Sequence, residues 1–206
     1  MTTTTASRSR PRRSDVREQV LRAAATAFSR HPYADVSVAA IAAAAGFTKG
    51  AVYSNFGGKP ELLAAVLAEE FTELLGGVVQ SALAAMTDGS PTSVPRVVAA
   101  ELTRGVVGEQ RLPALLAEFR ALAGRDPELA TVYVQLRLRQ RAGLEQLLAS
   151  VADRVPLAPG VDRTVAATLL LTCVNSVSLE YAAAPASMPE PLVEAMFTHV
   201  LTGLLG

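Results

Sequence analysis

The stretch Ser37–Lys59, SVAAIAAAAGFTKGAVYSNFGGK, predicts two short helices joined by a glycine turn. Apolar residues in its first half recur at the three- and four-residue intervals of a buried helix face: Val38, Ile41, Ala42 and Ala45. Ser37 stands at the N-cap position, and Gly46 can end the helix because glycine adopts positive φ at little cost. Thr48 then caps a second helix. At about nine residues this helix is too short to be stable alone, so we expect packing to hold it.

The second helix has one packing face and one face of small and polar residues. Val52 and Phe56 lie four residues apart and supply the packing face. The outer side and the leading end carry Lys49, Gly50, Ala51, Tyr53 and Ser54. Small residues let the backbone approach base edges, and a lysine and a tyrosine can reach bases or phosphates. The stretch therefore predicts a helix-turn-helix that contacts DNA.

On these residues the chain resembles the tetracycline-repressor (TetR) family of bacterial transcriptional regulators. The family pattern is a Ser/Thr cap, an Ile-Ala pair, a Gly, a Ser/Thr-Lys-Gly, a Tyr, a Phe and a Lys. It is met by Ser37, Ile41 with Ala42, Gly46, Thr48 to Gly50, Tyr53, Phe56 and Lys59. Resemblance at the level of the motif extends from Val16 to Leu63, and beyond it only length and helical character agree.

The resemblance implies a role for each residue of the motif. Lys49, Gly50 and Ala51 would face base edges, with Ser54 on the same side, and the phosphates would be held by Ser37, Thr48, Tyr53, Asn55 and Lys59. The chain departs from the family in three places: Ala39 replaces a polar base-reading residue of some relatives, and Ser54 and Asn55 replace aromatic or histidine residues. Direct base contacts are therefore expected to be sparse.

Charge is divided unevenly along a chain whose formal net charge is zero. Residues 1–60 contain nine Lys and Arg against three Asp and Glu, a net charge of +6, and residues 61–206 contain ten Arg against sixteen acids, a net charge of −6. A basic N-terminal part indicates nucleic-acid binding there, because neutralising phosphates supplies most non-specific affinity. Residues 1–13, MTTTTASRSRPRR, are expected to be a disordered basic arm. This arm either contacts DNA or is an ordinary solvated tail.

The rest of the chain predicts an all-α protein of about nine helices. Residues 14–60 form the predicted DNA-binding domain, whose first helix runs from Asp15 to Arg30 with Ser14 as its cap. Residues 61–206 form a larger helical domain for ligand binding and dimerisation. Its expected helices cover residues 60–86, 96–107, 113–123, 127–151, 161–183 and 190–205, and a loop is expected at 88–95.

The segment Thr164–Leu179 has sixteen residues and no charge. A membrane span needs about 20 apolar residues, and this segment contains Asn175 and several hydroxyls, so we expect no membrane insertion. A helix that is apolar all round is buried on all sides. One interpretation is a homodimer interface with the last helix, comprising Leu170, Val174, Val177, Met196, Phe197 and Val200. The alternative is a core within one chain.

A small-molecule effector, if there is one, is expected in a mostly aliphatic pocket that suits a hydrophobic or amphipathic molecule. Phe119, Tyr133 and Asn175 are the candidate ligand-binding residues, because each is an aromatic or polar group on an aliphatic helix. Core packing is the competing explanation for each of them.

No catalytic, metal-binding or cofactor motif was found. The two histidines lie outside any catalytic pattern, and the single cysteine, Cys173, cannot form a structural zinc site. Together with the lack of a secretory segment, that cysteine predicts a reducing cytoplasm. The favoured function is a homodimeric repressor that binds a palindromic DNA operator and is released by a small ligand. A helical regulator without a ligand is the second hypothesis, and a helical enzyme or interaction module is the third.

Overall fold

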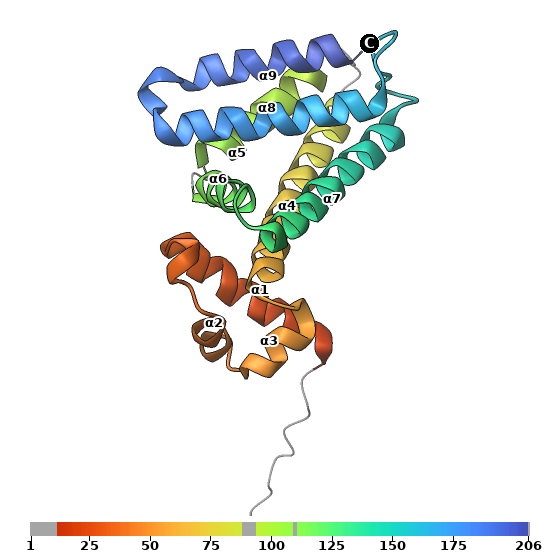
Figure 1. Cartoon of the computed structure of the whole chain (residues 1–206). Helices are drawn as coiled ribbons and strands as arrows, with labels where there is room; N and C mark the ends of the chain where they lie inside the picture. Colours follow the sequence, from red (N-terminus) through yellow and green to blue (C-terminus); the bar gives the residue numbers. More distant parts are fainter. Residues whose placement is uncertain (1–11, 88–93, 109–110, 206) are drawn as a thin grey trace, which may run out of the picture. The chain divides into compact units, whose positions relative to one another are not determined.

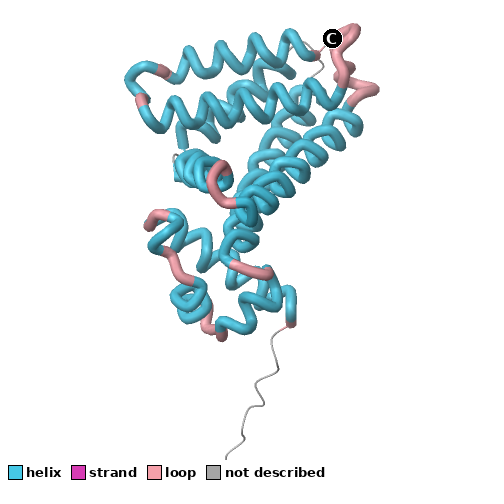
Figure 2. Tube along the Cα trace, viewed as in Figure 1, coloured by secondary structure: helices cyan, strands magenta, loops and turns pink. Residues whose placement is uncertain are grey.

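A computed structural model describes residues 12–87, 94–108 and 111–205, and helices dominate this part of the chain (Figures 1 and 2). Its nine α-helices confirm the all-α class that the sequence predicts. They are α1 (Arg13–Arg30), α2 (Val38–Ala44), α3 (Lys49–Phe56), α4 (Lys59–Thr87), α5 (Val94–Gly108), α6 (Arg111–Ala123), α7 (Pro127–Val151), α8 (Arg163–Ala183) and α9 (Glu190–Leu204). Residues 1–11 of the predicted arm and 88–93 of the predicted loop lie outside the described residues.

Contacts divide the chain into two compact units, Met1–Val66 and Leu67–Gly206, which we call the head and the body. The head has its own apolar core, to which α1, α2, α3 and the start of α4 all contribute. Its buried side chains are Val20, Ala24, Phe28, Val36, Val38, Ile41, Ala42, Val52, Leu62, Leu63 and Val66. The short helix α3 is thus held by packing, as its length requires, through Val52, which is fully buried.

Several helix starts differ from the prediction by one or two residues, those of α1, α4, α5, α6 and α8. Helix α1 begins at Arg13, and the Ser14 hydroxyl lies 3.0 Å from a carboxylate oxygen of Asp15. Ser14 therefore lies inside the helix, and its prediction as the cap is wrong. Helix α5 begins at Val94, so that Pro95 occupies the first turn. Proline is tolerated there because that N–H has no partner within the helix.

The body packs its helices around a second core. Helix α5 packs against α9, and α8 contacts α5, α6, α7 and α9. In Figure 1, α8 and α9 run side by side as an antiparallel pair. Aspartates cap two of these helices: Asp126 accepts hydrogen bonds from the backbone of Glu128 and Leu129, and Asp162 accepts two at the start of α8.

Helix α8 is, by length and composition alone, long and apolar enough to cross a membrane. In the structure it lies among four other body helices, and Ala166, Ala167, Leu170, Leu171 and Val177 are buried. Its apolar character therefore serves a helical core on one side only. Val165, Leu169 and Leu179 are exposed, so within a single chain α8 is not buried on all sides as its composition predicts.

Candidate nucleic-acid interface and body pocket

The turn between α2 and α3 is closed by local hydrogen bonds. The Ser37 hydroxyl accepts from the Ala40 N–H at 3.1 Å, and the Thr48 hydroxyl accepts from the Ala51 N–H at 3.3 Å. Gly46 has φ of 76°, and the N–H groups of Gly46 and Phe47 donate to the carbonyls of Ala43 and Ala42. This pair of bonds is a Schellman motif, whose left-handed position favours glycine. Both predicted caps and the predicted glycine turn are confirmed.

Most of the predicted DNA-contacting residues lie on one side of the head. Thr48, Gly50, Ala51, Ser54 and Asn55 line a hollow of about 630 Å³ together with Arg13, Val16 and Phe47. Lys49 is exposed on the same helix, and 52% of Tyr53 is accessible to solvent. Small side chains with an exposed lysine and phenol leave room for a nucleic-acid backbone to approach. The assignment of these residues to DNA contacts remains a prediction.

Arg13 contributes to this surface, although it lies in the segment 1–13 that the sequence predicts to be a disordered arm. Its guanidinium donates to the Ser54 carbonyl at 3.1 Å and to the Asn55 side-chain oxygen at 3.4 Å. The Asn55 amide in turn donates to the Ala51 carbonyl at 2.7 Å. A phosphate contact by Asn55 would therefore compete with internal hydrogen bonds. The basic character of residues 1–13 was the only feature of the sequence that indicated a place for Arg13 on the candidate DNA surface of the head.

Lys59 is held against the head, in contrast to Lys49. Its ammonium lies 4.2 Å from the centre of the Tyr33 ring and 3.4 Å from the Ala34 carbonyl oxygen, to which it donates. Tyr33 stacks on Phe28, with ring centres 6.1 Å apart. A cation over an aromatic face stabilises the fold whether or not DNA is present. The predicted phosphate contact of Lys59 would add to this structural contact or compete with it.

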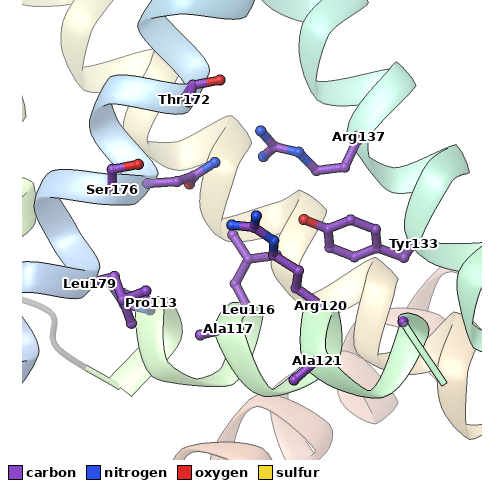
Figure 3. Close-up of a pocket in the computed structure, with 12 residues that line it drawn as sticks. Pro113, Leu116, Ala117, Arg120, Ala121, Tyr133, Arg137, Thr172, Ser176 and Leu179 are labelled. Atoms are coloured by element: carbon purple, nitrogen blue, oxygen red, sulfur yellow. The ribbon is translucent and has the colours of Figure 1, made fainter.

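The body contains a pocket of about 580 Å³ between α6, α7 and α8, shown in Figure 3. Its lining includes the predicted residues Tyr133 and Asn175, together with Arg120, Arg137, Thr172 and Ser176. Phe119, the third candidate, does not line it: Phe119 is fully buried and packs edge-on against Tyr133, with ring centres 5.6 Å apart. Phe119 thus positions the tyrosine, and its prediction as a ligand contact is corrected.

This pocket is more polar than the mostly aliphatic pocket that the sequence predicts. Arg120 comes from α6 and Arg137 from α7, and each looks like an ordinary surface arginine in the sequence. Burial lowers the pKa of the Arg137 guanidinium; the neighbouring phenol of Tyr133 opposes this effect and the charge of Arg120 adds to it. Nothing in the local sequence marks these two arginines, because only helix packing brings them together.

Comparisons with known proteins bear first on the head. Residues 20–66 match the family model described as "Bacterial regulatory proteins, tetR family". This match covers most of α1, all of α2 and α3, and the first turns of α4, which together carry the candidate DNA surface. Over these residues the chain is similar to bacterial regulatory proteins of the tetR family, as the resemblance of the motif implies. This similarity supports a DNA-binding role for the head.

Solved structures share the fold of this chain along nearly its whole length. A Rhodococcus protein assigned to the TetR family of transcriptional regulators has a TM-score of 0.71 at 15% identity, over 94% of this chain and 100% of that one. A TetR transcription regulator from Haloarcula marismortui has a TM-score of 0.60 at 19% identity, over 94% and 100%. FadR from Bacillus subtilis, solved with stearoyl-CoA, has a TM-score of 0.64 at 15% identity, over 90% and 98%. No curated protein matches the chain.

The predicted dimer residues of the chain fall into two groups. Leu170, Val177 and Phe197 are buried within the body of a single chain, so their assignment to a surface between chains is corrected. Val174 and Val200 are partly buried against the same core, and Met196 is 37% exposed. A helix that is apolar on every side has no polar face, so its sequence does not indicate which face is buried. The packing of α8 and α9 decides it.

Among the described residues, no group of three or more His, Cys, Asp or Glu side chains is placed to hold a metal ion. The candidate sites of this chain are the head surface and the body pocket. Both are built from hydrogen-bonding, cationic and apolar groups, which suit binding of ligands.

Proposed function

We propose that this regulator is a homodimeric repressor whose α3 helices bind a palindromic DNA operator, and that a small molecule in the body pocket releases it. The observation that carries the proposal is the exposed face of α3, where Lys49 and Tyr53 stand among small residues beside a hollow in the head. The net charge of +6 in residues 1–60 supports the same surface, since cationic side chains displace counterions from DNA.

Dimerisation is supported by exposed apolar side chains on α8 and α9. Val165, Leu169, Leu192 and Met196 are 52%, 50%, 45% and 37% exposed. Val165 and Leu169 are four residues apart on α8, and Leu192 and Met196 are four residues apart on α9, so each pair shares one face of its helix. Exposed apolar side chains that share a face mark interaction sites. We therefore place the proposed interface at these residues instead of Leu170, Val177 and Phe197. A two-fold dimer would present two α3 helices to half-sites about 34–36 Å apart, which is the spacing of a palindrome.

Control by a ligand is supported by the body pocket, whose volume of about 580 Å³ is that of a small-molecule site. The FadR structure with stearoyl-CoA is an instance of a similar fold that holds a small molecule. Release of the operator requires that the ligand bind two conformations of the regulator with different affinity. By thermodynamic linkage, the operator then weakens ligand binding by the same factor.

Selection of bound DNA from a random pool tests the proposal. The full chain is incubated with the pool, bound molecules are amplified over several rounds, and the products are sequenced. We expect a palindrome of two half-sites. A parallel selection with a Lys49→Ala, Tyr53→Phe double variant is the control, and it should enrich this palindrome less. Enrichment of a single half-site would contradict the dimer, and no enrichment would contradict specific DNA binding.

A further inference from the structure

We propose that the body pocket takes an organic anion with an apolar tail, whose head group is held by Arg120 and Arg137. This inference rests on the proposed function, because it assigns a chemical class to the effector. Figure 3 shows both guanidinium groups and the Tyr133 hydroxyl pointing into the same space. They come from two helices, Arg120 from α6 and Arg137 with Tyr133 from α7.

The charge of the pocket is unbalanced. Its lining residues include two arginines and no Asp or Glu. The ion pairs within the described part of the chain use other arginines, namely Arg22, Arg104 and Arg141. Arg137 is partly buried and Arg120 is exposed. Their like charges repel each other, and neither is neutralised by an acid of the pocket. An anion bound between them would remove that repulsion.

The donors of the pocket match an acceptor with two or more oxygens. Arg137 donates one hydrogen bond to the Gln140 side-chain oxygen at 3.0 Å, and Gln140 is itself buried. This bond holds the guanidinium in place while its other N–H groups remain available. A guanidinium presents its donors as a fork that fits carboxylate and phosphate oxygens. The Thr172 and Ser176 hydroxyls also point into this space from α8.

An apolar groove of about 290 Å³ adjoins the pocket and shares Pro113, Leu116 and Asn175 with it. Its other apolar lining residues are Leu67, Phe71, Leu74, Leu102, Val106 and Val174. The acidic residues of this groove, Glu70 and Glu73, do not line the arginine pocket. An anionic head group is therefore directed to the arginines, and an apolar tail finds its surface in the groove.

The experiment compares ligands that share a tail and differ in the head group. Isothermal titration calorimetry on the full chain without DNA measures the Kd of octanoate, octyl phosphate and 1-octanol. We expect at least one of the two anions to bind about tenfold or more tightly than 1-octanol, since a charge-assisted hydrogen bond contributes that much. The two anions distinguish a carboxylate from a phosphate head group. The proposal would be overturned if 1-octanol had the same Kd as the anion that binds best, or if neither anion bound.

Variants then locate the anion. Arg120→Gln and Arg137→Gln should each raise the Kd of the bound anion about tenfold, and the double variant should raise it at least as much as either single variant. Arg139→Gln removes a charge from an exposed position of the same helix α7 and serves as the matched control, with an unchanged Kd. An unchanged Kd in the double variant would overturn the proposal. Circular dichroism melting curves establish that each variant is folded, and the wild-type comparison of head groups needs no variant.

A separate measurement keeps this site distinct from the regulatory function. Operator affinity is measured by fluorescence anisotropy with and without the bound anion. Binding of the anion with no change in operator affinity would contradict ligand release while leaving the anion site intact. If octanoate and 1-octanol lower operator affinity equally, the result would contradict the anion site. It would not contradict control of the regulator by a ligand.

Discussion

Two lysines that the sequence places in one predicted DNA surface have different surroundings in the structure. Lys49 is exposed on α3, whereas the Lys59 ammonium lies 4.2 Å from the Tyr33 ring centre and donates to the Ala34 carbonyl. The same residue type therefore has two physical roles. An exposed ammonium is available to DNA, and one held over an aromatic ring contributes to the stability of the head.

Substitution of the two lysines should separate these roles. Lys59→Ala should lower the stability of the head by about 0.5–1 kcal/mol, because the cation–π contact is lost. Lys49→Ala should leave stability unchanged and reduce discrimination between the operator and a shuffled site by about 1–3 kcal/mol. Thermal unfolding and fluorescence anisotropy measure the two effects. A stable Lys59→Ala variant would show that the ring contact contributes nothing.

At the scale of the element, the short pair α2 and α3 depends on its turn. Gly46 adopts φ of 76°, and a Cβ added there would meet nothing within 4 Å. A larger side chain would therefore fit here, and glycine is favoured only because the backbone has a positive φ. Helices α8 and α9 differ from this turn, because no local feature of their sequence determines which of their sides lies on the surface. Both helices are apolar, and only their packing in the body determines which of their side chains are exposed.

Gly46→Ala should destabilise the head by about 1–2 kcal/mol through the cost of the left-handed conformation. The matched control is Gly50→Ala in the same unit, where a new Cβ would lie 3.7 Å from the Thr48 hydroxyl oxygen, an ordinary contact. Alanine is the better helix former, so Gly50→Ala should increase stability by up to about 1 kcal/mol. Chemical denaturation measures both. Equal effects would contradict the assignment of the turn.

Leu169→Asp on α8 should convert the proposed dimer into a folded monomer, because it places a charge in an apolar interface. Val134→Asp on α7 is the control: Val134 is 51% exposed and Leu169 is 50% exposed, so the two changes perturb one chain similarly. Light scattering after size exclusion gives the mass of each. A dimeric Leu169→Asp variant would place the interface elsewhere, and a monomeric Val134→Asp variant would show that the effect is not local to α8 and α9.

At the scale of the whole molecule, one helix belongs to both units. Helix α4 contributes Leu62, Leu63 and Val66 to the core of the head and Val78 and Ala85 to the core of the body. A continuous helix anchored in two cores can transmit a change in one unit to the other. The proposed coupling of effector and operator requires such a connection.

Operator DNA should weaken binding of the effector by the factor by which the effector weakens binding of the operator, and this factor should be about 5–150-fold. The measurement is the Kd of the anion that binds best among octanoate and octyl phosphate, with free and with operator-saturated protein. Equal affinity for the two forms would exclude release by that ligand. The Arg137→Gln variant should respond to this ligand only at higher concentration.

The sequence by itself determined the all-α class, the caps Ser37 and Thr48 and the glycine turn between them, because these depend on interactions within a few residues. Tertiary structure alone decided the rest. It brought Arg120 and Arg137 together from different helices, paired Lys59 with Tyr33, and selected which apolar residues of α8 are buried. Such contacts join residues distant along the chain, and a helix apolar on every side carries no periodic signal to predict them.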